Sequence, residues 1–163
     1  MLTHTDVCTL LVNPEDKDIL TRKLFDVNLR LMKTSPKYRQ IVQIAADYIS
    51  DLAFTEREGY KKPHGFSGAN AGIPWNIIAV TPDYEPMLNP HILGNSDGDV
   101  VHSYSNCGSL LLAEPLEIYR YKKIKFEYWD LNIERHEKTG YYPTVQHEID
   151  HNNGILITDR KVE

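Results

Sequence analysis

Two histidines and a glutamate near the end of the chain have the spacing of a metal site. Residues 146–151 read Gln-His-Glu-Ile-Asp-His, so His147 and His151 are four residues apart. On a helix, two side chains at this spacing project from the same face, one turn apart. Their imidazoles could hold one divalent cation, while Glu148 exchanges a proton with water on that cation. The pattern predicts a metallohydrolase; a surface helix with scattered histidines and acids is the alternative.

The residues around this motif predict the helix that it needs. Pro143 suits a first helical turn, and Val145 and Ile149 form an apolar pair one turn apart that could face a core. The Asn-Asn-Gly run at residues 152–154 is typical of a helix end. The motif is therefore expected on a short helix beginning near Pro143.

A third metal ligand must come from elsewhere in the chain. Twelve residues follow His151, and none of them is His or Cys. A common His-Glu-x-x-His peptidase, whose third ligand usually lies downstream, is thus a weaker hypothesis. Cys107 is the best candidate, because a thiolate binds divalent metals, although a lone Cys is more often a buried structural thiol. The remaining candidates are His64, His91, His102 and His136.

Periodicity upstream predicts the elements that position these residues. A helix is expected from Asn13-Pro14 through Val27, and a second from Ser35-Pro36 to Leu52. Residues 56–72 are rich in Gly, Lys and polar groups and predict a long loop. Strands are predicted over residues 77–81, 87–93, 100–105, 109–113 and 118–130. Helices followed by antiparallel strands and one short helix predict an α+β fold, as a single domain over residues 1–163.

Composition restricts the class of protein. The chain of 163 residues is long enough to bury a core without disulfides, and its two cysteines give no disulfide framework. A formal charge of −5 argues against direct nucleic-acid binding. No apolar run is long enough for a membrane span. These features predict a cytoplasmic protein without membrane partners, and we expect a monomer; a viral or organellar source is also compatible with them.

A longer string around the metal motif resembles a known family. Residues 146–154, Gln-His-Glu-Ile-Asp-His-Asn-Asn-Gly, resemble the third motif of the peptide deformylases at nearly every defining position. The Gly-rich segment 65–72 resembles the first motif, with Asn70 in the place of the family's glutamine. Residues 105–109, Ser-Asn-Cys-Gly-Ser, fall on the second motif, which reads Glu-Gly-Cys-Leu-Ser in the family. The resemblance covers roughly residues 36–160.

The resemblance implies a fold, a reaction and a cofactor. The fold would place antiparallel sheets around the short metal-binding helix, with helices on the N-terminal side. The reaction would remove the N-formyl group from formyl-methionyl peptides or nascent chains, in association with the ribosome, and release formate. Cys107, His147 and His151 would hold one divalent ion, iron(II) in most of the family, with zinc, nickel and cobalt as alternatives. Such an ion lowers the pKa of bound water from ~15.7 to ~7.

The resemblance also implies roles for the remaining site residues. Glu148 would take a proton from the metal-bound water and pass it to the leaving amine. The side-chain amide of Asn70 and the backbone N–H of Gly108 would stabilise the charge that develops on the formyl oxygen. Asn is shorter than glutamine by one C–C bond, about 1.5 Å. Losing such a donor typically costs ~10²–10³ in rate, so Asn70 is a point where activity could depart from the family.

Two further departures concern the substrate. His64, Gly65 and Phe66 follow the edge that would pair with a peptide backbone, and a solvated loop position is the alternative for His64. Ser105 stands where the family has an acid, so Arg120 loses an expected partner. We expect Arg120 either to be free to bind another anion, such as a substrate, or to be structural.

Other functions remain open at this point. The chain could be a deformylase-like hydrolase of a different formylated or amide substrate. It could also be a catalytically silent, metal-binding homologue that acts through partners. Turnover of formyl peptides, compared with metal occupancy, separates these hypotheses.

Overall fold

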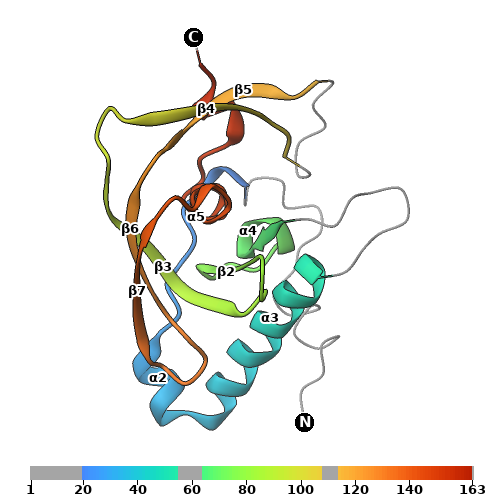
Figure 1. Cartoon of the computed structure of the whole chain (residues 1–163). Coiled ribbons are helices and arrows are strands. Elements are labelled where there is room, and N and C mark those ends of the chain that lie inside the picture. Colours follow the sequence, from blue (N-terminus) through green and yellow to red (C-terminus); the bar gives the residue numbers. More distant parts are fainter. Residues whose placement is uncertain (1–19, 55–63, 108–113, 163) are drawn as a thin grey trace.

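The computed structural model describes residues 20–54, 64–107 and 114–162. Figure 1 shows two antiparallel sheets around a central helix, with a long helix on the outer side. The elements, in chain order, are α2 (Leu29–Thr34), α3 (Pro36–Phe54), β1 (Gly65–Ser67), α4 (Gly68–Ala71), β2 (Ile77–Val80), β3 (Pro86–Asn95), β4 (Val100–Ser105), β5 (Leu116–Tyr121), β6 (Ile124–Trp129), β7 (Arg135–Gly140), α5 (Pro143–Asn152) and the 3₁₀ helix η2 (Ile157–Arg160). The predicted α+β class is confirmed.

The strands form one large sheet and one small one. The five-stranded sheet has the order β1-β2-β3-β6-β7, and β4 pairs with β5 in a separate two-stranded sheet. All of these pairs are antiparallel. β1 therefore lies at one edge of the large sheet. None of the helices among the described residues is long and apolar enough to cross a bilayer.

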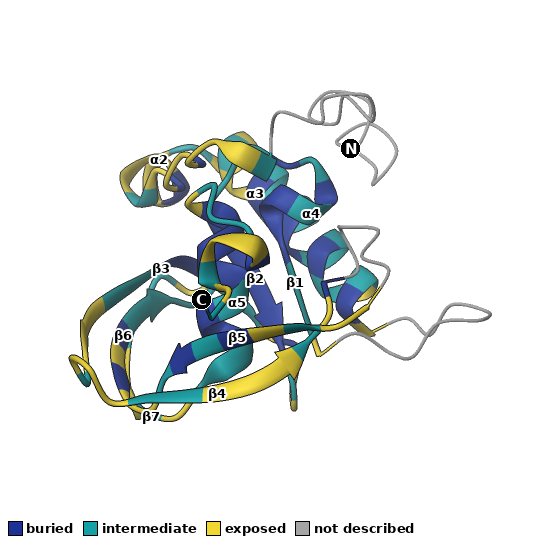
Figure 2. Cartoon of the chain, turned by 90° about the horizontal axis from the view of Figure 1, so that it is seen from above, coloured by how far each residue is buried: buried dark blue, intermediate teal, exposed yellow. Residues whose placement is uncertain are grey.

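Strand β2 separates two cores because its side chains alternate between faces. Ile77 and Ala79 pack in the core that includes α3, whereas Ile78 and Val80 pack with Val145 of α5. All four residues of β2 are buried. Figure 2 shows the contrast between this buried centre and the largely exposed β4 at the periphery.

Helix α3 forms as its periodicity predicts. Ser35 precedes it, and its hydroxyl accepts a hydrogen bond from the backbone N–H of Tyr38 at 3.3 Å. The buried side chains recur at spacings of three, four and one, which places them on one face: Val42, Ala45, Ala46, Ile49 and Ala53. The helix continues two residues beyond the predicted end at Leu52.

The first predicted helix is wrong where the structure describes it. Residues 20–28 are largely extended rather than helical, and residues 1–19 lie outside the described part of the chain. Leu24 and Val27 are buried, but Phe25 between them is 74% exposed. The buried side chain of Asn89 pairs with both main-chain groups of Val27, accepting from N–H at 2.7 Å and donating to C=O at 2.9 Å. Tertiary hydrogen bonds therefore replace helical ones here.

The predicted strand over residues 118–130 is two strands in two different sheets. β5 ends at Tyr121 and β6 begins at Ile124. Between them, Lys122 N–H donates to the carbonyl of Asp99 and Lys123 N–H to the hydroxyl of Ser96, which turns the chain from one sheet to the other. Lys122 and Lys123 interrupt the alternation here, but two consecutive lysines do not show that the chain passes from one sheet to another.

Three further segments are a predicted loop, a strand that was not predicted and a predicted strand outside the described residues. The loop predicted over residues 56–72 is wrong for 65–71, which form β1 and α4. Strand β7 was not predicted, because its sequence Arg-His-Glu-Lys-Thr-Gly has no buried residue and therefore no apolar alternation. The strand predicted over residues 109–113 lies outside the described residues.

Candidate metal centre

The motif helix forms as predicted, with α5 beginning at Pro143 and ending at Asn152. Val145 and Ile149 pack against Ile78 and Phe126 of the large sheet. Most of the remaining side chains of α5 are also buried. The helix therefore lies inside the molecule, and the surface-helix alternative is wrong.

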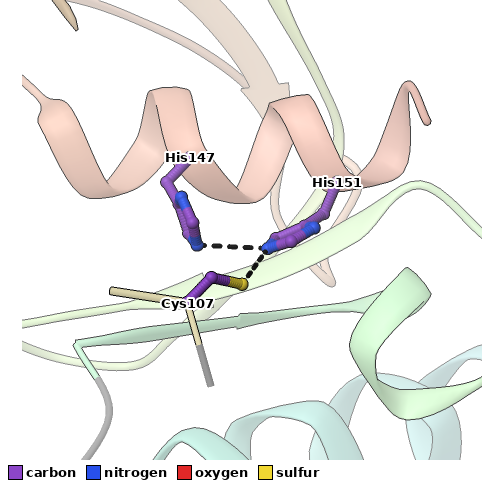
Figure 3. Close-up of side chains that lie close together, drawn as sticks. All are labelled: Cys107, His147 and His151. Carbon is purple, nitrogen blue, oxygen red and sulfur yellow. Dashed lines mark hydrogen bonds between the residues drawn. The ribbon is translucent and has the colours of Figure 1, made fainter. Parts of the chain in front are cut away.

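Three ligand-type atoms meet beside α5. Nε2 of His151 lies 3.1 Å from Nε2 of His147 and 3.2 Å from Sγ of Cys107 (Figure 3). Cys107 follows β4 and is buried, as is His151. Cys107 was expected to join the two histidines. The fold brings its thiol beside them, although Cys107 is 44 residues from His151 in sequence.

Burial keeps both imidazoles in the form that binds metals. Burial, together with the charges of His151 and Arg120, lowers the pKa of His147 to about 3. Burial also lowers the pKa of His151 to about 4, against the raising effect of Asp150. Neutral imidazoles offer a lone pair at neutral pH, as metal binding requires.

The donor set fits a divalent transition metal. One sulfur and two ring nitrogens within 4.8 Å of one another can close around a single ion. Ligands of this softness suit iron(II), zinc, nickel or cobalt rather than magnesium or calcium. Three protein ligands leave a coordination position for water or substrate, as in catalytic metal sites.

The other candidate histidines are placed elsewhere. His91 Nε2 lies 3.0 Å from Asp26 Oδ2, and His136 Nε2 lies 3.0 Å from Asp130 Oδ2. His64 and His102 are exposed. Among the described residues, the group that combines Cys107 with histidines contains only His147 and His151.

Glu148 is a buried carboxyl next to these ligands. It is 4% exposed, and its Oε2 has no hydrogen-bond partner among the described residues. Burial raises its pKa to about 8, against the lowering effects of the neighbouring Ser67 hydroxyl and the charge of Arg120. A carboxyl that titrates near neutral pH can both accept and donate a proton, as a general acid–base group must.

Strand β1 lies directly against Glu148. A Cβ built on Gly65 would lie 3.0 Å from Oε1 of Glu148 and 2.8 Å from Cγ2 of Thr144. A side chain at Gly65 would therefore force the side chains of Thr144 and Glu148, or β1 itself, to shift. The glycine lets the edge strand of the large sheet pass close to the candidate site.

Arg120 is not free for another anion, which corrects that expectation. It is 4% exposed, and its guanidinium donates to Oδ2 of the equally buried Asp150. The same guanidinium lies 3.0 Å from Nδ1 of His147. Asp150, rather than residue 105, is therefore the acidic partner of Arg120. The structure thus assigns Arg120 the structural alternative, behind the metal ligand.

Two other buried amides, which the motif analysis left without a role, orient α5. Gln146 pairs with both main-chain groups of Tyr121 in β5, at 2.9 Å each. Asn152 accepts from the N–H of Ala69 and donates to the carbonyl of Ile77. The sequence signal for this role was the presence of two amides on a helix that was expected to be central, because buried amides need hydrogen-bond partners.

Comparison with known proteins then decides the family. The family model described as "Polypeptide deformylase" matches residues 22–163. The chain belongs to the polypeptide deformylase family. It is 32% identical over 149 residues to a peptide deformylase of Dictyoglomus turgidum, covering 87% of this chain and 92% of that protein. Membership confirms the predicted assignment as a hydrolase that removes N-formyl groups from peptides.

Solved deformylase structures share the fold. The actinonin-bound class I type b peptide deformylase of Acinetobacter baumannii has a TM-score of 0.68 at 25% identity, covering 93% of this chain and 95% of that one. A Plasmodium falciparum peptide deformylase in complex with an inhibitor has a TM-score of 0.63 at 21% identity, covering 94% and 88%. The second likeness concerns the fold alone.

The remaining residues of the first two deformylase-like motifs lie at β1 and α4 or outside the described residues. Asn70 lies on α4, and its amide is bonded to Ser67. Phe66 is partly buried and packs against the core on the α3 side. His64 is exposed just before β1. Gly108, the expected second donor, lies outside the described residues.

Proposed function

We propose that this deformylase removes the N-formyl group from formyl-methionyl peptides or nascent chains at the centre formed by Cys107, His147 and His151. One observation carries the proposal: a sulfur and two ring nitrogens converge beside the buried carboxyl of Glu148, in a chain of this family. Iron(II) is the proposed native ion, with zinc, nickel and cobalt as alternatives.

In the proposed reaction Glu148 first accepts a proton and then donates one. A divalent ion at the centre would lower the pKa of water and polarise the formyl carbonyl. Glu148 takes a proton as water adds to the formyl carbon, and returns a proton to the nitrogen as the C–N bond breaks. Water and formamide thereby become formate and a free amine. Burial of this carboxyl disfavours its charged form, which favours its holding the proton between the two steps.

Strand β1 is the proposed docking edge for the peptide. It is an edge strand of the large sheet, and β2 pairs with one of its two sides. An extended peptide could add to the other side through main-chain hydrogen bonds. Gly65 would bring this peptide next to Glu148, and exposed His64 and the main chain of Phe66 would flank it.

Formate release from formyl-methionyl peptides by iron-loaded protein tests this function. We expect turnover that falls to background in Glu148→Ala, with metal content unchanged. Metal content is measured on the same samples. Full metal occupancy without turnover would reject the proposal in favour of a silent homologue. Turnover of other formylated compounds but not of formyl peptides would change the substrate.

A further inference from the structure

One fully buried hydroxyl connects Asn70 with the site. Ser67 ends β1, is 0% exposed and is the N-cap of α4. Its Oγ donates to Oδ1 of Asn70 at 2.5 Å and accepts from the backbone N–H of Asn70 at 3.3 Å. Ser67 therefore holds both the main chain and the side-chain amide of the same residue.

The same hydroxyl is adjacent to the proposed general base. Its oxygen is also within hydrogen-bonding reach of the Glu148 carboxyl. Ser67 thus lies between Asn70 on α4 and Glu148 on α5. Among the described residues, this is the contact that links the two proposed catalytic side chains through a single atom.

The backbone leaves the hydroxyl little freedom to move. Ser67 pairs with Ile78 in the register of β1 and β2. At the next residue, a Cβ on Gly68 would lie 2.2 Å from the carbonyl oxygen of Trp75. Strand pairing holds Ser67 on one side, and close backbone packing holds it on the other. A residue held in this way can fix the position of a neighbouring side chain.

A fixed hydroxyl decides how an amide is turned. A serine has one O–H proton to donate, and only the oxygen of a side-chain amide can accept it. With Oδ1 held by Ser67, the NH₂ group of Asn70 must lie on the opposite side of the amide. Without that bond the amide could rotate and present its oxygen where a donor is needed.

We propose that Ser67 is a positioning residue that sets the amide of Asn70 for donation to the substrate oxygen and keeps it in register with Glu148. The proposal rests on the proposed function. The alternative is an ordinary helix cap, whose removal lowers Tm and leaves kcat unchanged.

A double-mutant cycle distinguishes the two roles. We compare the wild type, Ser67→Ala, Asn70→Ala and the double variant by formate release from a formyl-methionyl peptide. Displacing or losing a transition-state donor costs on the order of 10²-fold in rate, so Ser67→Ala should lower kcat by about 10–100-fold with little change in KM. In the Asn70→Ala background the same substitution should change kcat by less than about twofold, because its effect goes through Asn70.

Two controls separate positioning from stability. Ser67→Thr keeps the hydroxyl and should restore most of kcat. Ser50→Ala removes a hydroxyl that bonds the carbonyl of Tyr84 at 2.8 Å, away from the site, and should lower Tm without lowering kcat. Each variant is assayed well below its own Tm.

The outcomes have distinct meanings. Equal losses of kcat from Ser67→Ala in both backgrounds, or a lower Tm with unchanged kcat, overturn the positioning role while the proposed function stands. A wild-type protein that releases no formate overturns the proposed function and the positioning role together. A coupled loss of kcat that Ser67→Thr restores supports both.

Discussion

At the scale of single residues, this deformylase combines groups whose burial prepares them for metal chemistry. His147 and His151 are kept neutral, because burial lowers the pKa of each. Glu148 is affected in the opposite direction, because burial disfavours the charged form of a carboxyl. The centre therefore offers neutral nitrogen ligands beside a carboxyl that holds its proton more strongly than usual.

Removing one ligand should abolish metal binding. We expect His151→Ala to lose the bound ion and formate release to fall to background, because two remaining ligands hold the ion weakly. Metal analysis and activity are measured on the same preparation. His91→Ala is the matched control, since His91 is bonded to Asp26 instead. Retention of one metal per chain by His151→Ala would contradict the proposed ligand set.

Glu148 should make the metal-free protein less stable as pH rises. Its pKa is raised from 4.5 to about 8, so between these values the folded state binds more protons than the unfolded state. Stability contributed by this group is therefore present below about pH 4.5 and is lost as pH rises through 8. In chelator, the stability of Glu148→Gln relative to wild type should increase from pH 5 to pH 8.

Urea unfolding at several pH values measures this difference, and the effects of the histidines cancel because both proteins contain them. Glu117→Gln, at an exposed position of β5, is the control for the Glu-to-Gln substitution itself. A constant difference between Glu148→Gln and wild type across the range would contradict the raised pKa.

At the scale of elements, helix α5 is positioned by side chains that bond to other elements. Val145 and Ile149 give it an apolar contact with the large sheet, which resists separation but does not define rotation. Hydrogen bonds do define it, because they have preferred distances and directions. Gln146 attaches the helix to β5, and Asn152 attaches it to β2 and to the start of α4.

Removing the amide of Asn152 should destabilise the fold. Asn152→Ala leaves the buried N–H of Ala69 and carbonyl of Ile77 without this partner, at a cost of about 2–3 kcal/mol in unfolding free energy. Asn153→Ala is the matched control, because Asn153 is exposed and its side chain bonds only to the carbonyl of Ile149 among the described residues. Denaturant unfolding compares the two variants. Equal losses would show that Asn152 does not anchor the helix.

A side chain at Gly65 should separate β1 from the site. In Gly65→Ala the added methyl meets Thr144 and Glu148 at 3.0 Å or less. A shift near 1 Å in the docking edge or the general base would lower kcat/KM by about 10²-fold. Gly94→Ala in β3 is the control, because a Cβ there meets nothing within 4 Å. Comparable activity of the two variants would contradict the close approach.

At the scale of the whole molecule, one ionic network joins the small sheet to helix α5, which packs against the large sheet. Asp150 on α5 bonds Arg120 of β5 and Arg160 of η2, the latter at 2.7 Å through Oδ1. β5 is paired along its length with β4, and Cys107 lies two residues beyond the end of β4. The network therefore helps to keep the thiol of one sheet close to the histidines that pack against the other.

Weakening this network should reduce metal affinity without removing a ligand. In Asp150→Asn the charge that faces both arginines is lost, and groups behind metal ligands typically contribute 10–100-fold in affinity. We expect a decrease of about that size, measured by competition with a chromophoric chelator. Asp99→Asn, in an exposed ion pair with Lys122, is the control. Unchanged affinity would show that the sheets are held together by other contacts.

The sequence by itself determined the elements whose signals are local. Helix α3 and helix α5 were both predicted, because their apolar positions recur at helical spacing and their ends carry suitable residues. The pairing of His147 with His151 follows from the helix alone, since four residues complete about one turn. The longer string around them was specific enough to indicate the family.

Only the tertiary structure decided what the remaining residues contact. The partner of Arg120 is Asp150, 30 residues away, and the partner of Val27 is Asn89, 62 residues away. Neither pair has a sequence signal, because a buried polar group needs a partner but the sequence does not say which one. The position of Ser67 between Asn70 and Glu148 likewise depends on β1 packing against α5. Local periodicity therefore predicts the helix that carries the chemistry, whereas long-range packing decides how its side chains are oriented.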